Sequence, residues 1–529
     1  MLQPPFDPTS QVVFDTAKAW IRTCRRSHKR CQIGDETGLS PLPTRVIDVG
    51  TSDAPTVRLH VTGSGELAER GEYACLSYCW GGDQFKTLLG NLEALKKEIP
   101  IARLSLTVAD AVEVIRRLGL RYLWVDALCI VQDSSEDKAR EIVKMGAIYK
   151  NSTVTIAAAT ASAASQGFLR RPLPVLRSAA VRVRLPNDEI GIVRLTLTDF
   201  YKTGRSRPLL DHPLDSRGWC LQEYLLSPRM LVFSKFSVER ICQVDEVAAG
   251  DGPFGHGQIR GPKFRLPTAI FGGNTIRDQL IQVVSRDPKF LVPVERIRIW
   301  NKIVSDFSGR GLTDPRDRLP ALAGIVGELQ RVWKDEYIFG MWKGLLPWML
   351  AWVSEEPPKG PQSQRLSLAP TWSWASINSP VCFHHSHTEP IFARNTLIDI
   401  TWETGAENHM AASSPPFPRL AVNGTLVRST DAPREPLTTW LDFDGPFDQE
   451  EWSYLVITRN ANWYWSGDVP TSLVENKMTY LVLKSVEGME GVYTRVGLAA
   501  HRHKRGILRE HDCAWSKVSK TPRVKIYLV

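Results

Sequence analysis

The chain has 529 residues, of which 43% are hydrophobic and 23% are charged. This ordinary globular composition excludes a disordered or collagen-like chain, and the length predicts about three domains or one large two-part body. Lys and Arg number 66 against 57 Asp and Glu, so the net charge of +9 is a mild bias toward anionic partners and no nucleic-acid signature. The 17 tryptophans nearly equal the 18 phenylalanines, which indicates an architecture that favours large rings with an N–H donor.

Several features predict a cytoplasmic protein without a membrane span. Met1–Ser10 has neither the basic nor the apolar segment of a secretory signal. The longest apolar stretch, Phe339–Val353, contains Lys343 and Pro347 and is too short to cross a bilayer. The nine cysteines are an odd number at scattered spacings, which favours reduced thiols.

From the N-terminus, helical spacing of apolar residues predicts a helix over Val12–Cys31 with a basic end, followed by strands at Arg45–Val49 and Thr56–Leu59. Strands and helices then alternate over residues 72–160. The predicted strands are Tyr73–Tyr78, Arg121–Val125 and Thr153–Ala157, and the predicted helices are Leu106–Leu118, with Thr107 as its N-cap and Gly119 as its stop, and Ser135–Tyr149. Short apolar strands joined by helices predict a parallel sheet covered on both faces.

The pattern then changes. Alternation over Ala179–Leu197, around Pro186–Asp188, predicts an inserted β-hairpin, and a helix at Trp219–Leu226 and a strand at Arg229–Phe233 follow. Helical periods dominate Asn274–Val353, including its apolar end. Past a loop at Pro357–Gln364, alternating strands dominate, for example in Phe392–Trp402. We therefore predict an N-terminal part (1–59), an α/β domain (60–245), a helical region (246–356) and a β-rich C-terminal region (357–529).

Three motifs stand out in the α/β part. They are Tyr73-Ala-Cys-Leu-Ser-Tyr-Cys-Trp-Gly-Gly82, Tyr122-Leu-Trp-Val-Asp-Ala-Leu-Cys-Ile-Val-Gln-Asp133 and Arg217-Gly-Trp-Cys-Leu-Gln-Glu-Tyr-Leu-Leu-Ser227. With these three motifs in this order, the chain resembles the heterokaryon-incompatibility (HET) domain of filamentous fungi. The resemblance covers roughly residues 45–245. Leu312–Gly324 and Ala369–Ser376 resemble the usual C-terminal companion of such domains. The resemblance implies a role in self/non-self recognition and programmed cell death.

HET domains in turn resemble the Toll/interleukin-receptor (TIR) fold, and three sites carry that resemblance here: Leu76–Tyr78, Asp126 and Trp219–Glu223. It implies a TIR/flavodoxin-like parallel-sheet core. In TIR enzymes the glutamate that matches Glu223 supports cleavage of the nicotinamide–ribose bond of NAD. Glu223 is therefore the catalytic candidate, with NAD as the candidate substrate and no resident cofactor.

Ligands of open parallel sheets collect beyond the carboxyl ends of the strands. The candidate ligand-binding residues follow two predicted strands or share a helix face with Glu223; they are Ser77, Tyr78, Trp80, Gly81, Asp126, Cys129, Gln132 and Trp219. Trp80 could stack on a base or on nicotinamide, and Gly81 permits close backbone approach. Structural alternatives stay open: Glu223 paired with Arg217 or Arg229, Asp126 bonded to its own turn, and Trp80 as a core ring.

Other chemistry has weaker support. Cys79, Cys129 and Cys220 lie in the three motifs, but no histidine accompanies them there as a base for a nucleophilic thiol. Cys24, His28 and Cys31 offer three soft ligands, and a zinc ion would need a fourth from Cys242 or a distant histidine. We therefore assign no metal site, and whether these residues bind metal stays open.

Three functions compete at this stage. The favoured one is a HET-domain cell-death effector that cleaves NAD. The second is a non-catalytic signalling or assembly module, in which the same surface mediates self-association or binds a protein partner. The third is a HET-fold enzyme that has been recruited to small-molecule metabolism. Because the basic runs Arg22–Arg30 and His501–Arg505 lack interleaved aromatic residues, we expect no nucleic-acid partner.

Overall fold

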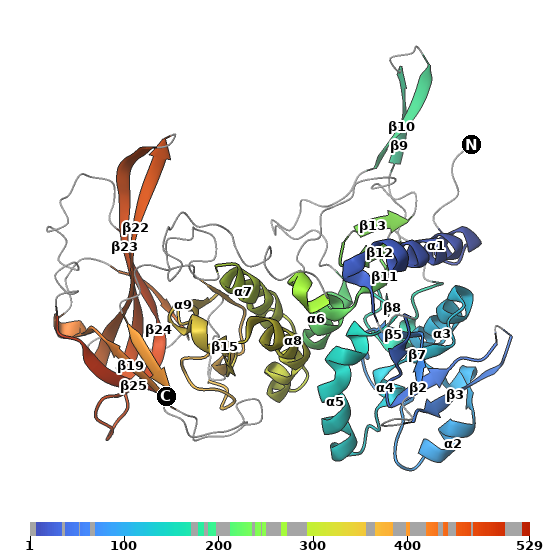
Figure 1. Ribbon diagram of the computed structural model, residues 1–529, viewed down its shortest axis with the longest axis horizontal. Helices are drawn as coiled ribbons and strands as arrows, with labels where there is room; N and C mark the ends of the chain where they lie inside the picture. Colours follow the sequence, from blue (N-terminus) through green and yellow to red (C-terminus); the bar gives the residue numbers. More distant parts are fainter. Residues whose placement is uncertain are drawn as a thin grey trace. The chain divides into compact units, whose positions relative to one another are not determined.

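The computed structural model describes residues 7–33, 38–51, 53–63, 69–170, 178–184, 189–196, 212–234, 238–244, 246–249, 266–271, 294–355, 365–383, 398–402, 419–431, 437–442, 451–466, 469–502 and 521–529. The chain forms two compact units, Met1–Gly273 and Asn274–Val529 (Figure 1). The predicted turn Pro186–Asp188, the loop Pro357–Gln364, and residues 274–293 of the predicted helical region lie outside the described residues.

A nine-stranded mixed sheet forms the centre of the first unit, in the order β13-β12-β11-β8-β5-β7-β2-β3-β6 (Figure 1). The strands are β2 (Arg45–Asp48), β3 (Thr56–Val61), β5 (Tyr73–Ser77), β6 (Ile99–Pro100), β7 (Tyr122–Trp124), β8 (Val154–Ala157), β11 (Arg229–Phe233), β12 (Val238–Cys242) and β13 (Glu246–Ala249). A separate short pair joins β1 (Ser40–Pro41) to β4 (Arg70–Gly71).

The predicted parallel sheet is confirmed for its four central strands only. Strands β7, β5, β8 and β11 run parallel, whereas β2, β3 and β6 on one side and β12 and β13 on the other are antiparallel to their neighbours. The reason lies in the connections. Strand β3 follows β2, and β12 follows β11, after only a few residues, and such short connections reverse the chain.

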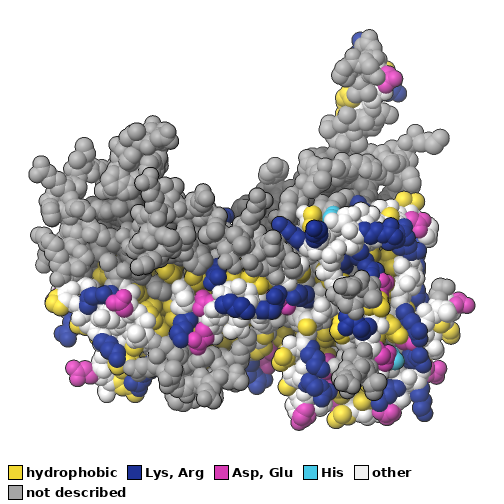
Figure 2. Space-filling model, viewed as in Figure 1, with side chains coloured by type: hydrophobic (Ala, Val, Ile, Leu, Met, Phe, Trp, Pro, Cys, Tyr) yellow, Lys and Arg dark blue, Asp and Glu magenta, His cyan; other side chains and the backbone are white. Residues whose placement is uncertain are grey.

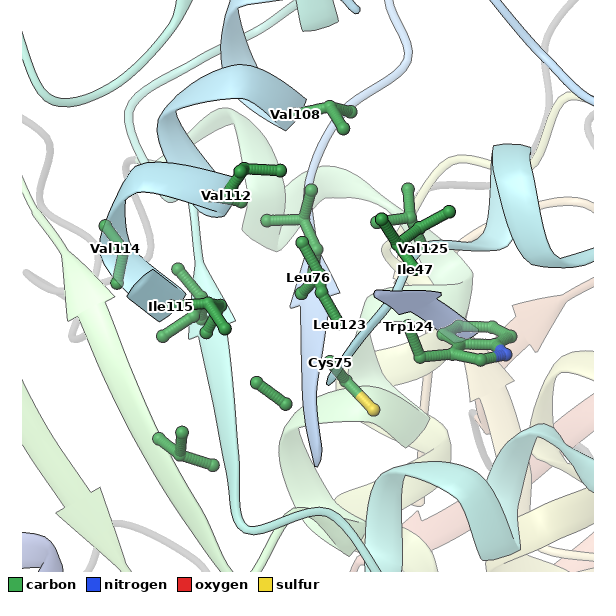
Figure 3. Packing of buried hydrophobic residues seen from close by; sticks show 14 of the residues in the cluster. Ile47, Cys75, Leu76, Val108, Val112, Val114, Ile115, Leu123, Trp124 and Val125 are labelled. Carbon is green, nitrogen blue, oxygen red and sulfur yellow. The ribbon is translucent and has the colours of Figure 1, made fainter. Parts of the chain in front are cut away.

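Helices cover the parallel strands on both faces, as predicted. The helices of this unit are α1 (Gln11–Ser27), α2 (Leu92–Lys97), α3 (Leu106–Leu118), α4 (Asp126–Cys129), α5 (Ser135–Lys150) and α6 (Gly218–Leu226). On one face, Val108, Val112 and Ile115 of α3 point toward the strands that carry Leu76 and Leu123 (Figure 3). On the other, Trp124 of β7 meets Tyr149 of α5 edge to face, with ring centroids 5.6 Å apart.

Helix α3 shows how closely local signals set its ends. Gly119 ends it with a left-handed φ of +80°, as its position predicts. The predicted N-cap was wrong: Ser105 occupies that position with extended backbone angles, and Thr107 is buried inside the first turn. The predicted hairpin is confirmed, with β9 (Ser178–Arg184) antiparallel to β10 (Ile190–Thr196).

The second unit carries the predicted β-rich region as an eight-stranded sheet. Its order is β18-β19-β25-β24-β23-β22-β20, with β21 paired to β24. The strands are β18 (Asp399–Trp402), β19 (Leu420–Gly424), β20 (Leu426–Arg428), β21 (Thr438–Leu441), β22 (Trp452–Ser466), β23 (Val469–Ser485), β24 (Val492–Arg502) and β25 (Val524–Leu528). Helices α7 (Val294–Ser308) and α8 (Ala323–Trp333) precede it.

The apolar stretch before this sheet differs from the prediction of one helical segment. It contains β15 (Met341–Trp342), the short helix α9 (Leu346–Met349) and β16 (Trp352–Ser354); β15 pairs with β14 (Tyr337–Ile338), and β16 with β17 (Val381–Phe383). Phe339 and Gly340 both have positive φ angles, of 41° and 90°, so the chain turns sharply where a helix would have to continue. No helix among the described residues is long and apolar enough to cross a membrane.

Tryptophans fill the core of the second unit. The indole N–H groups of Trp300 and Trp374 both donate to the carbonyl oxygen of Gly340, at 2.9 Å and 2.7 Å. Trp342 lies edge to face against Trp300 and Trp333. The unusual tryptophan content therefore has a structural explanation in this unit, because these rings are almost fully buried.

Candidate functional site

Predicted site residues from separate motifs meet at the carboxyl ends of the central strands. Ser77 is the last residue of β5, and Asp126 lies two residues beyond the end of the neighbouring parallel strand β7. Glu223 comes from α6, which precedes β11. The parallel pairing brings the first two motifs to one edge of the sheet, and the third motif adds its helix to the same place.

Glu223 is the most strongly perturbed acid of this group. Its side chain accepts a hydrogen bond from the hydroxyl of Ser77, and only 4% of the residue is exposed. Burial raises the pKa of Glu223 to about 7, against the opposing effects of the Arg217 charge and the Ser77 hydrogen bond. The negative charge of Asp126 raises the pKa further. Glu223 therefore exists in both protonation states near neutral pH.

Arg217 is the cation of the site. One of its guanidinium nitrogens donates to the carbonyl oxygen of Tyr78, and its charge acts on both Glu223 and Asp126. The sequence offered Arg217 only as a structural partner of Glu223. Arg229, the other suggested partner, donates instead to the carbonyl oxygens of Thr153 and Cys31.

Trp80 and Asp126 form a second polar contact. The indole N–H of Trp80 donates to Oδ2 of Asp126 at 2.9 Å, and the backbone N–H of Ala127 donates to Oδ1 at 2.7 Å. Asp126 thus bonds its own turn, as the structural alternative supposed. Although Asp126 keeps some exposed surface, burial of its carboxyl group raises its pKa, while the charge of Arg217 opposes the rise.

The remaining candidates near Asp126 interact with the chain itself. Gln132 donates to the carbonyl oxygens of Asp126 and Ile130, at 3.0 Å and 3.1 Å, so it supports the turn. The hydroxyl of Tyr78 accepts a hydrogen bond of 2.7 Å from Gln84, a residue that the sequence motifs did not single out.

Three further candidates lie against packed chain. Gly81 has a φ of +65°, and a Cβ atom there would collide with Ser162 and Ala163. The backbone at Gly81 therefore lies close to another segment of the chain. Trp219 is half-buried against the apolar core. Cys129 lies within that core, where burial raises the pKa of its thiol to about 12.

A cavity of about 660 Å³ lies elsewhere in this unit, where β7 begins rather than ends. Its lining includes Arg58, Lys97, Arg116 and Arg121 around Asp48. Burial acts to raise the pKa of Asp48, but hydrogen bonds from Arg121 and Arg58 lower it to about 2. Sequence patterns gave no sign of this basic cavity. The basic lining of this cavity is a local feature. On the face of the molecule that Figure 2 shows, Lys and Arg side chains are spread out, and acidic side chains lie among them.

The first unit is thus an α/β domain with buried carboxyl groups at the carboxyl ends of its parallel strands. Residues 73–223, from β5 to Glu223, match the family model described as heterokaryon incompatibility protein (HET). The match confirms the resemblance predicted from the three motifs and supports a role related to heterokaryon incompatibility. Neither the search among curated proteins nor the search among solved structures found a match.

Proposed function

We propose that this protein is a HET-domain effector of incompatibility and cell death that hydrolyses the nicotinamide–ribose bond of NAD. One observation carries the proposal: the buried Glu223 carboxyl group, hydrogen-bonded by Ser77 at the end of β5, has a pKa of about 7. Strongly shifted pKa values with identifiable charged partners are concentrated at functional sites.

The proposed reaction needs one ionised carboxylate. The C–N bond between ribose and nicotinamide breaks, its electron pair leaves with neutral nicotinamide, and water adds to the ribose carbon with release of a proton. Since the leaving group is neutral, no general acid is required. The site has to stabilise an oxocarbenium-like ribose and hold its 2′ and 3′ hydroxyls, and ionised Glu223 supplies the negative charge for both.

Other residues of the site would shape the pocket. The Trp80 ring is the candidate surface for stacking of nicotinamide, held in place by its bond to Asp126. Arg217 favours the ionised form of Glu223, because its positive charge opposes the effect of burial. No resident cofactor or nucleic acid enters this proposal; the small-molecule partner is the dinucleotide.

The order of the parallel strands supports a TIR/flavodoxin-like core. Along the chain, β5, β7, β8 and β11 are first to fourth, and in space they lie in the order second, first, third, fourth. This is the order of flavodoxin-like sheets, in which ligands bind beyond the carboxyl ends where the strand order reverses. The reversal falls between β5 and β8, and Ser77 ends β5.

A specific observation favours an assembly module as the second candidate function. The Glu223 side chain is nearly inaccessible and already bonded to Ser77. A ribose could reach it only after neighbouring residues moved. In this alternative, the polar network stabilises the domain, and its surface mediates self-association or binds a protein partner. Assembly could equally be the event that opens an enzymatic site.

Nicotinamide release from NAD by the purified full chain distinguishes these functions. We expect release by the wild type and a loss of about 100-fold or more in Glu223→Gln. The matched control is Glu141→Gln, since Glu141 is also a buried acid that accepts hydrogen bonds, from Thr44 and Lys144. Undiminished release by Glu223→Gln would refute its role. No release at any protein concentration, together with self-association in light scattering, would favour the assembly module.

A further inference from the structure

Four potential metal ligands from two distant parts of the first unit meet where α1 ends. Cys24 lies in the last turns of α1, His28 directly follows the helix, and Cys31 ends a short 3-10 helix, Lys29–Cys31. Cys242 is the last residue of β12. One atom of each side chain lies within 4.8 Å of those of the other three. The sequence showed three of these ligands as a group, and the fold supplies the fourth.

The geometry of the cluster suits a tetrahedral ion. A zinc site with bonds of about 2.3 Å to sulfur and about 2.05 Å to nitrogen has ligand atoms about 3.6–3.8 Å apart. Nδ1 of His28 lies 3.4 Å from Sγ of Cys242. All three cysteines are reduced and buried. Three sulfurs and one imidazole form one of the usual ligand sets of structural zinc sites.

Two of the sulfurs accept hydrogen bonds from backbone N–H groups. The backbone N–H of Val244 donates to Sγ of Cys242 at 3.4 Å, and that of Gln243 donates to Cys31. Such outer hydrogen bonds stabilise the negative charge of thiolate ligands.

A buried cation lies beside the same sulfurs. Arg229 is fully buried; it donates to the carbonyl oxygen of Cys31, and its charge interacts with Cys24 and Cys31. A buried guanidinium requires compensation by negative charge. Three thiolates around a divalent ion keep one net negative charge, which compensates Arg229.

We propose that Cys24, His28, Cys31 and Cys242 bind one structural zinc ion. All four positions of a tetrahedral ion are then taken by protein ligands, so the site has no open position for catalysis. The ligands lie on both sides of the HET match at residues 73–223. The ion therefore fastens α1 and the segment after it to the antiparallel edge of the sheet, and it does so independently of the proposed NAD cleavage.

Metal content of the purified full chain tests the proposal. After exchange into metal-free buffer, we expect about one zinc per chain in the wild type and almost none in Cys242→Ser. The matched control is Cys382→Ser, because Cys382 is a free cysteine of the second unit, and it should retain the ion. A wild type without zinc that also fails to take up added Zn²⁺ would overturn the proposal, and so would full zinc content in Cys242→Ser.

A measurement on the wild type covers the case in which Cys242→Ser does not fold. Titration with an organomercurial should release the zinc, detected with a chromogenic chelator, in step with modification of buried thiols. Replacement by Co²⁺ should give the visible absorption of a tetrahedral site with sulfur ligands. Release of zinc without thiol modification, or an octahedral cobalt spectrum, would show that the metal binds elsewhere. A disulfide among the three cysteines in freshly purified protein would also contradict the proposal.

Discussion

The hydroxyl of Ser77 donates a hydrogen bond to the carboxylate of Glu223, a residue 146 positions away in the chain. The bond connects the carboxyl end of β5 to α6 and thus joins the first of the three sequence motifs to the third. Both residues are buried, so the bond forms where a carboxylate interacts strongly with its neighbours. The protonation state of Glu223 should therefore influence both stability and activity.

Stability should decrease as the pH rises toward neutral because of Glu223. The usual pKa of this group is 4.5, and in the folded chain it is about 7. Between these values the folded state binds more protons than the unfolded state, so each rise in pH favours unfolding. Glu223→Gln removes this effect and should be more stable than the wild type above pH 7, by at most about 3 kcal/mol. Denaturant unfolding of both proteins at pH 5 and pH 8 measures the difference between their free energies of unfolding. If this difference were the same at both pH values, it would contradict the raised pKa of Glu223.

Nicotinamide release, if Glu223 acts as an anion, should increase with pH through about 7. Ser77→Ala removes the hydrogen bond that favours the ionised form and should move the midpoint upward by about one pH unit or more. The control is Ser152→Ala, which removes another buried hydroxyl, one that donates to the carbonyl oxygen of Tyr149. Equal midpoints in Ser77→Ala and the wild type would show that this bond does not set the pKa of the catalytic group.

Gly81→Ala should destabilise the first unit by roughly 2–4 kcal/mol, from backbone strain and overpacking together. Gly81 has a φ of +65°, and an added Cβ would lie 2.6 Å from the carbonyl oxygen of Ser162. Gly90→Ala is the control, because no atom lies within 4 Å of a Cβ there and its φ is ordinary. Denaturant unfolding of both variants checks the difference. If Gly81→Ala were as stable as the control, the segment that contains Ser162 would have to shift at little cost in free energy. This result would show that the chain beside the candidate site can move.

Local sequence signals predicted the elements of residues 73–223 and their central parallel strands, but not the specific contacts between distant segments. Helix α3 and its stop at Gly119 follow from apolar spacing and from the backbone freedom of glycine. The contact of Ser77 with Glu223 depends on strand order and on a helix beyond an insertion, which no local period encodes. The approach of Cys242 to Cys24 depends likewise on the hairpin that places β12 beside α1.

The apolar stretch at 339–353 shows the opposite failure, in which a local signal misled. Its apolar residues fit a helix, yet the positive φ angles of Phe339 and Gly340 redirect the chain into short strands. The carbonyl oxygen of Gly340 accepts hydrogen bonds from Trp300 and Trp374, so burial of indoles from distant segments outweighs helix propensity here.

The buried pair of Arg495 and Asp442 should be a major source of stability in the second unit. Nε of Arg495 donates to Oδ2 of Asp442 at 3.1 Å, both side chains are fully buried, and the guanidinium lies 3.6 Å above the Trp352 ring. Arg495→Lys keeps the charge but loses the planar fork and its stacking on the ring. We expect a loss of about 3–5 kcal/mol, because the change leaves buried groups unpaired. Denaturant unfolding followed by tryptophan fluorescence measures it.

The control for this change is Arg428→Lys, an exposed position in β20, which should alter stability by no more than about 0.5 kcal/mol. Asp442→Asn should be about as destabilising as Arg495→Lys, since it removes the buried negative charge that faces the guanidinium groups of Arg495 and Arg365. The double variant should lose less than the sum of the single losses, because both remove the same interaction. Additive losses would show that Arg495 stabilises the unit through its bonds to the carbonyl oxygens of Leu350 and Trp352, rather than through Asp442.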